Sequence, residues 1–182
     1  MFAAQQNQLN LKAPSASLST KDMFIPTCAT CHMSGLNGRG VTHDPSERLS
    51  YNLFAEVTQA RPNADRAQAK MKDICLQCHT PPLVDRIYKE GIAVVDATNE
   101  KVLAAKSIMD SLKADGLIST NPFSQTIQFT YFDLWHYYGR TAKHAAFMGG
   151  ADYVQWHGNY PILQHTVELK EQAAQLRKKN GK

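Results

Sequence analysis

Two copies of one five-residue pattern constrain this chain of 182 residues more than any other feature. The sequence Cys-Ala-Thr-Cys-His occupies residues 28–32, and Cys-Leu-Gln-Cys-His occupies residues 75–79. The chain has four cysteines, and all four belong to these two copies. No cysteine is therefore left over for a structural disulfide elsewhere or for a separate catalytic thiol.

Each copy predicts the covalent attachment of one c-type haem, because two thiols three residues apart can reach the two vinyl groups of one porphyrin. The histidine that follows is directed onto the iron. A zinc site made from both Cys-x-x-Cys pairs is the main alternative, but 43 residues lie between the two pairs, against about 15 to 20 in compact zinc modules. We therefore expect two haems, the first (haem A) on Cys28 and Cys31 with His32 as proximal iron ligand, and the second (haem B) on Cys75 and Cys78 with His79.

The group that fills the sixth position of each iron decides what the haem can do. A second histidine gives an electron carrier, whereas an open position gives ligand binding or catalysis. For any one of the remaining histidines, a surface or core role is about as common as iron ligation. These histidines are His43, His136, His144, His157 and His165, of which His165, in the exposed-looking last helix, is the weakest candidate.

The charge balance does not favour a nucleic-acid partner. The chain has 20 basic and 16 acidic residues, which gives a net charge of +4. Apart from Arg177, Lys178 and Lys179 near the C-terminal end, the basic residues are scattered along the chain. Two haems would add roughly four propionates and bring the net charge close to zero. No apolar stretch approaches the ~20 residues of a membrane span.

The expected location rests on the motifs rather than on a targeting segment. Residues 1–19 lack the apolar core of a signal peptide, yet covalent haem attachment normally follows export. We therefore expect an exported protein, in the periplasm or an equivalent bacterial compartment, whose leader is not visible in this sequence.

The sequence predicts an all-α fold of the multihaem cytochrome c type, in which short haem-bearing helices accompany long C-terminal helices packed as a bundle. Residues 1–20 are expected to form a mobile arm, 21–82 a dihaem-binding segment and 83–182 a long-helix region that packs on the haems and on partner subunits. Asp44 is a predicted N-cap for a helix over about 45–59. A second helix is predicted over about 64–77, and no run of alternating strand residues is evident.

Regular apolar spacing begins at Val84, where apolar residues recur at alternating steps of four and three as far as Leu112. This pattern predicts one helix about 43 Å long, ending near Gly116. Its apolar face could cover the chain's own core or form a seam with another subunit. Residues 127–148 are aromatic-rich, with helix expected in the second half of the stretch, and a last helix is predicted over about 162–178.

Several stretches of this chain resemble the octahaem hydroxylamine oxidoreductase and hydrazine dehydrogenase family. The longest reads Tyr-Phe-Asp-Leu-Trp-His-Tyr-Tyr-Gly-Arg-Thr-Ala-Lys-His at residues 131–144. The others lie at residues 26–35, 41–44, 71–73, 147–152 and 155–160. The resemblance extends over about residues 24–178 and matches the C-terminal part of that family, which contains its last two haems and its long helices.

This resemblance has implications for catalysis. Family members carry eight haems, and the motif of the catalytic haem lies in the N-terminal part, which this sequence does not match. The resemblance thus implies no catalytic residue here and no oxidation of hydroxylamine or hydrazine by this chain alone. In family trimers a tyrosine from one subunit bonds to the catalytic haem of its neighbour, and the tyrosines in the matching region are Tyr138, Tyr137 and Tyr131.

The resemblance also orders the distal ligands. By analogy with these multihaem folds, His144 is expected to ligate haem A. In a full-length relative, the histidine that matches His43 would serve a haem for which this sequence has no motif. Haem B is expected to be five-coordinate or to take a ligand from a partner or another histidine, so the candidates for distal ligation, in order, are His144, His43, His136 and His157.

We accordingly expect a dihaem c-type cytochrome that acts as an accessory, assembly or electron-transfer subunit of a hydroxylamine oxidoreductase-like or hydrazine dehydrogenase complex. Its expected partners are full-length octahaem subunits, or other copies of itself through the long helices. The resemblance also implies that the expected compartment could be the anammoxosome. A stand-alone dihaem electron carrier and a fragment of a catalytic octahaem subunit are the alternatives.

Overall fold

The computed structural model describes residues 28–33, 41–52 and 55–181. The expected arm at residues 1–20 and the glycine-rich stretch at 34–40 lie outside the described residues. The chain divides into two compact units. We call the described parts of Met1–Asn52 and Gln59–Arg86 the motif unit, and the described parts of Leu53–Thr58 and Ile87–Lys182 the helical unit.

The motif unit contains both cysteine motifs. Its elements are α3 (Cys28–His32), the short 3-10 helix η2 (Pro45–Arg48), β1 (Tyr51–Asn52), β2 (Gln59–Ala60), α4 (Ala64–Cys75) and the first residues of α5 (Pro81–Ala114). Helix α4 confirms the helix predicted from residue 64 onward. Its buried side chains, Ala67, Met71 and Ile74, recur at steps of four and three, as expected for a helix with one apolar face.

The helix predicted over 45–59 is wrong. Asp44 does cap a turn, since its carboxylate accepts a hydrogen bond from the backbone N–H of Ser46 at 2.9 Å, but the turn ends at Arg48. Glu47 binds Lys70 instead of closing a capping box. Serine and asparagine are weak helix formers, and after Leu49 the chain pairs in an antiparallel hairpin, Tyr51 with Ala60 and Asn52 with Gln59.

Helix α5 has 34 residues and contains the whole predicted span of 84–112. Gly116 ends it with a positive φ of 73°, and the N–H of Leu117 closes the end by donating to the carbonyl oxygen of Leu112. The predicted apolar face is buried: Val84, Tyr88, Val95, Thr98, Val102, Ala105 and Leu112 are each less than 10% exposed.

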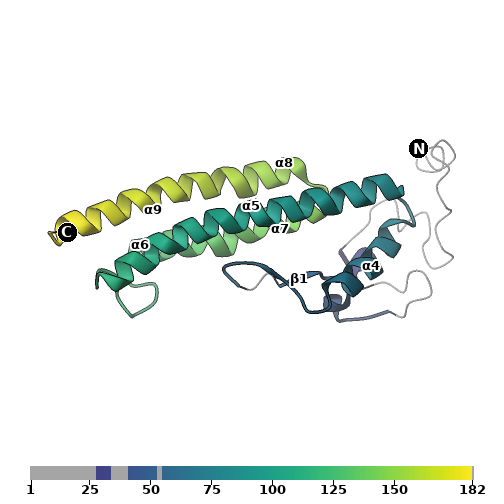
Figure 1. Ribbon diagram of the computed structural model, residues 1–182, viewed down its shortest axis with the longest axis horizontal. Coiled ribbons are helices and arrows are strands. Elements are labelled where there is room, and N and C mark those ends of the chain that lie inside the picture. The colour runs from purple at the N-terminus through teal and green to yellow at the C-terminus, as the bar shows by residue number, and fades with distance from the viewer. Residues whose placement is uncertain (1–27, 34–40, 53–54, 182) are drawn as a thin grey trace. The chain divides into compact units, whose positions relative to one another are not determined.

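The core of the helical unit forms where this face of α5 meets the helices that follow it. Val102, Ala105 and Leu112 pack in one cluster with residues of later helices, among them Leu134, Ile162 and Leu169. Figure 1 shows α9 running alongside α5. The core-facing interpretation of the α5 face is therefore confirmed, and the alternative of a seam with another subunit is wrong for this face.

The later helices are α6 (Thr126–Phe132), η3 (Asp133–Gly139), α7 (Arg140–Phe147), α8 (Ala151–Val154), η4 (Gln155–Asn159) and α9 (Tyr160–Lys179). Helix α9 contains the predicted span of 162–178. The aromatic stretch is helical from its start rather than only in its second half. The segments η3 and η4 are π-helical, a wider turn that sequence periodicity does not reveal. No described helix is long and apolar enough to cross a membrane.

A close approach joins η4 to α7 at Gly158. A Cβ atom at this position would lie 2.6 Å from Cβ and 2.8 Å from Cα of Ala142, which is far inside van der Waals contact. Only glycine therefore allows the two helical segments to pack at this distance.

A buried lysine connects Thr58 to the helices through hydrogen bonds. Lys143 is 1% exposed, and its Nζ donates to Oγ1 of Thr58 and to Oδ1 of Asn99, each at 2.8 Å. The side chain of Asn99 also pairs with the backbone N–H and carbonyl of Thr58. Burial without a carboxylate partner lowers the pKa of Lys143 to about 8.

Lys143 should contribute a stability that rises with pH between 8 and 9. Because an unfolded lysine has a pKa near 10.5, the lysine is more protonated in the unfolded chain than in the folded chain in this window, and its contribution to the free energy of unfolding should rise by about 1 kcal/mol. In the haem-free chain Cys75 and Cys78 act with the opposite sign in the same window, because burial raises their pKa from 9.0 to about 11. The contribution of Lys143 is therefore measured as a difference between variants, by urea titrations followed by circular dichroism.

The matched comparison for this prediction uses two lysine variants. Between pH 8 and 9 the free energy of unfolding should rise by about 1 kcal/mol less in Lys143→Met than in Lys113→Met, because Lys113 is exposed on α5. An equal pH dependence of the urea midpoint in both variants would contradict the assignment.

Candidate haem-binding site

The first motif forms the whole of α3, a helix of five residues. Because an α-helix repeats every 3.6 residues, Cys28 and Cys31 lie on the same side of this turn, with His32 directly after them. The N–H of Met33 donates to the carbonyl oxygen of Ala29 at 2.9 Å and closes the turn.

The second motif begins where α4 ends and has the same local geometry. The N–H groups of Cys78 and His79 both donate to the carbonyl oxygen of Cys75, at 3.1 and 2.9 Å. Cys75 and Cys78 therefore also lie on one side of a helical turn. Cys78 is buried and His79 is exposed. Both motifs thus present two thiols and an imidazole from one turn of helix.

The two motifs lie close together within the motif unit. Burial raises the pKa of both Cys75 and Cys78 to about 11, and the nearby Cys31 thiol adds to the rise in each case. Burial also raises the pKa of Cys31, against the opposing effect of the Arg48 cation. All four cysteines are free of disulfides. The two complete motifs therefore lie side by side. The raised pKa values mean that the thiols of Cys31, Cys75 and Cys78 are protonated at neutral pH.

Arg48 holds the first motif in place. It is only 3% exposed, and its Nη1 donates to the carbonyl oxygen of Cys31 at 2.7 Å. Burial and the Arg48 cation together lower the pKa of His32, which keeps the imidazole in the neutral form that ligates iron. Nδ1 of His32 is buried without a hydrogen-bond partner. Sequence reasoning missed Arg48, because nothing in the pattern around it distinguishes a buried arginine from a surface one.

The zinc alternative is not favoured by this geometry. Across residues 28–33, 41–52 and 55–181, no three His, Cys, Asp or Glu side chains are grouped so that they could hold a metal ion. A structural zinc site needs four such ligands around one point. A c-type haem brings its own iron and needs only two thiols and an axial imidazole from each motif. Each motif therefore has the residues that would hold one such haem.

The best-ranked candidates for distal ligation are exposed. His43 lies in the motif unit and has an exposed side chain. In the helical unit, the exposed His144 lines a shallow cleft of about 360 Å³ together with Met148 and Tyr153. The exposed ring of His157 lies 4.5 Å from that of Tyr153, centroid to centroid. The assignment of any of them to an iron stays a prediction.

The other two histidines of the helical unit are engaged by their neighbours. Nε2 of His136 lies 3.0 Å from Nη1 of Arg140, and its ring stacks on Phe132 at 4.4 Å. Because arginine can only donate, Nε2 of His136 is the acceptor and its lone pair is occupied. Nδ1 of His165 lies 3.1 Å from the carbonyl oxygen of Pro161.

The three tyrosines singled out from the sequence differ in accessibility. Tyr131 is buried, and its hydroxyl makes no well-aligned hydrogen bond, although the Glu56 carboxylate lies nearby. Burial, followed by the nearby Glu56 carboxylate, raises the pKa of Tyr131. Tyr138 is half-buried and packs against the ring of His165. Tyr137 is 64% exposed. Of the three tyrosines, it is the one whose side chain is most accessible to another molecule.

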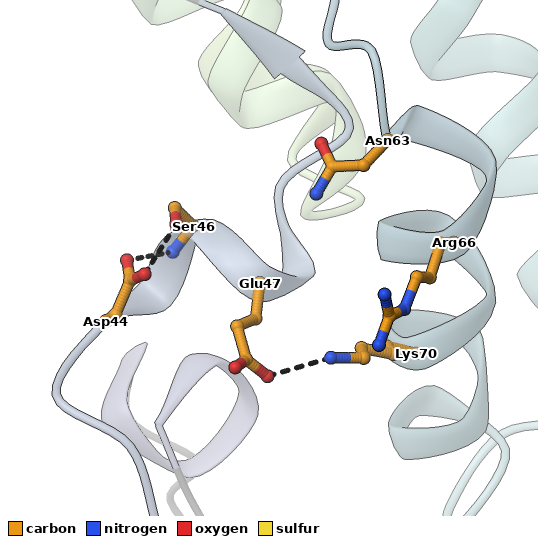
Figure 2. A pocket seen from close by; sticks show the side chains of 6 residues that line it. All are labelled: Asp44, Ser46, Glu47, Asn63, Arg66 and Lys70. Carbon is orange, nitrogen blue, oxygen red and sulfur yellow. Dashed lines mark hydrogen bonds and ion pairs between the residues drawn. The ribbon is translucent and has the colours of Figure 1, made fainter.

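A polar cleft of about 290 Å³ in the motif unit was not predicted from the sequence. Figure 2 shows Arg66 and Lys70 extending from α4 toward the η2 turn, where Nζ of Lys70 binds the Glu47 carboxylate at 2.9 Å. The hydrogen bond from Lys70 lowers the pKa of Glu47. Asp44, Ser46 and Asn63 complete the lining. Its charges largely compensate one another, and the cleft serves to join η2 to α4.

Comparison with known proteins identifies solved structures with a similar fold. No protein-family model matches the chain, and no curated protein matches it. A solved structure described as a hypothetical multihaem protein matches with a TM-score of 0.77 and 15% identity, over 94% of this chain and 48% of that chain. A chain of the reducing HAO-like protein complex of Kuenenia stuttgartiensis matches with a TM-score of 0.71 and 16% identity, over 90% of this chain and 47% of that chain. The fold is that of multihaem cytochromes.

The multihaem fold confirms the fold class expected from the sequence, despite the small hairpin in the motif unit. This chain spans about half the length of the two multihaem chains that it matches. The structural similarity extends to multihaem proteins, one of which belongs to an HAO-like complex. At 15–16% identity the likeness is one of fold alone.

Proposed function

We propose that this chain carries two covalent c-type haems and transfers electrons within a larger HAO-like assembly, as an accessory, assembly or electron-transfer subunit. The observation that carries the proposal is the pair of equivalent motifs: each supplies two thiols and an imidazole from one helical turn, and both lie in the same compact unit. Adjacent motifs would hold two irons near enough to each other for electrons to pass between them.

The chain's own residues have distinct roles in this proposal. Each thiol adds across a vinyl group, so that its sulfur forms the bond to carbon and its proton goes to the other vinyl carbon, with no oxidant needed. His32 and His79 are the proximal ligands, and Arg48 fixes the first motif while keeping His32 neutral. The bound haems would supply one-electron redox chemistry. The attached thiols are Cys28, Cys31, Cys75 and Cys78.

The similarity to a chain of an HAO-like complex supports a role in such an assembly. Because covalent haem attachment normally follows export, we place the protein in the periplasm or an equivalent compartment. The exposed Tyr137 is the best placed of the three tyrosines for a bond to a partner's haem. Each of the two matched chains is about twice as long as the part of it that this chain covers. This difference in length favours a second candidate function, in which this chain corresponds to part of a longer catalytic multihaem subunit.

Counting haems tests the central proposal. The chain should be produced in a bacterial host that has a cytochrome c maturation system and then denatured for intact-mass measurement. We expect the mass of the polypeptide plus two haems and a matching pyridine haemochrome absorbance. A haem-free chain that instead retains stoichiometric zinc would overturn the proposal.

Turnover separates the two candidate functions. The purified dihaem chain should exchange electrons with a redox mediator but should not consume hydroxylamine or hydrazine. Steady turnover of either compound by the chain alone would favour the catalytic-subunit candidate. Co-purification of the tagged chain with an octahaem partner would support the accessory role.

A further inference from the structure

The segment from α8 through α9 has two apolar faces, although a helix on a protein surface needs only one. The inner face packs into the core through buried residues such as Ile162, Leu169 and Ala173. The outer face carries five large apolar side chains that are each half exposed or more. They are Tyr153 (54%), Trp156 (64%), Tyr160 (54%), Leu163 (63%) and Val167 (50%).

Within α9 the exposed residues Tyr160, Leu163 and Val167 follow one another at steps of three and four, which is the spacing of a helix–helix seam. The same spacing continues to Lys170 and Ala174, both exposed. Tyr153 and Trp156 precede them across the wider turn of η4, and it is their exposure that places them on the outer surface. We call the set from Tyr153 to Ala174 the outer seam. It lies wholly within the helical unit. The rings of Trp156 and Tyr160 lie 6.2 Å apart, so these two side chains form one continuous surface.

The outer seam exposes a large apolar area. At about 200 Å² per aromatic side chain, the three rings alone leave roughly 350 Å² in solvent, and the aliphatic residues extend this further. The largest apolar patch on a typical monomer is about 300 to 600 Å², whereas a stable dimer buries about 800 Å² per partner. A dimer through the outer seam would therefore bury the polar residues at its borders as well.

We propose that the outer seam binds a second copy of this chain, with the two α9 helices antiparallel. The seam is divided by size, because its N-terminal half is aromatic and its C-terminal half is aliphatic. In an antiparallel pair each ring meets a smaller side chain. The facing pairs are Trp156 with Val167, Tyr160 with Leu163, and Tyr153 with the aliphatic stem and ammonium group of Lys170, a favourable cation–π arrangement.

The charges of α9 agree with this direction. Its last turn carries Arg177, Lys178 and Lys179. A parallel pair would bring six cations and two helix C-terminal ends of like dipole together, and would also set ring against ring along the seam. The antiparallel pair separates the two basic ends by the length of the seam. A two-fold symmetric contact of this kind is closed, so it gives a dimer rather than a filament.

The oligomeric state of the haem-loaded chain tests this proposal. Analytical ultracentrifugation should show a concentration-dependent dimer. Leu163→Glu, near the two-fold axis, should raise the dimer dissociation constant by at least about 30-fold with an unchanged far-ultraviolet circular dichroism spectrum. The control is Leu103→Glu, which replaces an apolar residue of α5 that is 49% exposed but outside the seam. This control should remain dimeric.

A pair of charge variants tests the antiparallel direction. Trp156→Lys and Val167→Glu should each be monomeric alone and should form a heterodimer when mixed, because the two positions face each other in the antiparallel pair. In a parallel pair they would be about 16 Å apart along the axis and could not rescue each other. A monomeric or trimeric wild-type chain, or a seam occupied only by a different protein, would overturn the proposal.

Discussion

Replacing Gly158 by alanine should lower the free energy of unfolding of the helical unit by about 3 kcal/mol or more. The added methyl group would meet Cβ, Cα and the backbone N of Ala142 at 2.6, 2.8 and 3.1 Å. Two of these three atoms belong to the backbone, so no side-chain rotation can relieve the contact. The segments η4 and α7 would have to separate, and overpacking of this kind typically costs 1 to 3 kcal/mol even where side chains can shift.

Gly150→Ala is the matched control for this prediction. A Cβ atom at Gly150 would have its nearest neighbours at 3.5 Å, which is ordinary contact, and its φ of −88° suits alanine. Urea denaturation followed by circular dichroism should therefore show a large loss for the Gly158 variant and a change within about 0.5 kcal/mol for the control. Similar midpoints for both variants would mean that the α7–η4 approach is not as close as described.

Replacing Cys75 and Cys78 together by serine should leave a chain with one covalent haem instead of two. Serine preserves the size of each side chain but cannot form the thioether bond. The first motif keeps both thiols, His32 and the Arg48 contact, so its haem should still attach. Intact-mass measurement under denaturing conditions should show the loss of one haem mass, and the haemochrome absorbance per chain should fall by half.

The reciprocal pair, Cys28→Ser with Cys31→Ser, is the control for independence of the two motifs. It should also retain one haem, this time on the second motif. If either pair of substitutions abolished both haems while the chain stayed folded, the two motifs would not be separate attachment sites. Retention of two haems by either double variant would contradict covalent attachment through these thiols.

The sequence predicted the long helices well because their apolar spacing reports directly which residues face the core. The steps of four and three from Val84 to Leu112 correspond to buried positions along α5. The predicted end at Gly116 is also correct, because a positive φ there favours glycine. Local patterns of this kind need no knowledge of distant residues.

Predictions failed where distant residues decide the structure. The helix expected after Asp44 gives way to a hairpin, because Tyr51 finds its partner at Ala60 and Glu47 finds Lys70. The attachment motifs were evident from five letters each, but the role of Arg48 depends on a contact with Cys31, 17 residues away. The π-helical turns likewise arise from packing and leave no sequence period.

The path of residues 55–58 has a practical consequence for protein engineering. The chain leaves the motif unit after Asn52, contributes Thr58 to the helical unit, and returns at Gln59. A single cut before Ile87 would therefore not release the helical unit intact. The excised piece would lack Thr58, and Lys143 and Asn99 would lose that partner inside the core. The two units are interlaced in sequence, so neither can be expressed whole as one uninterrupted segment.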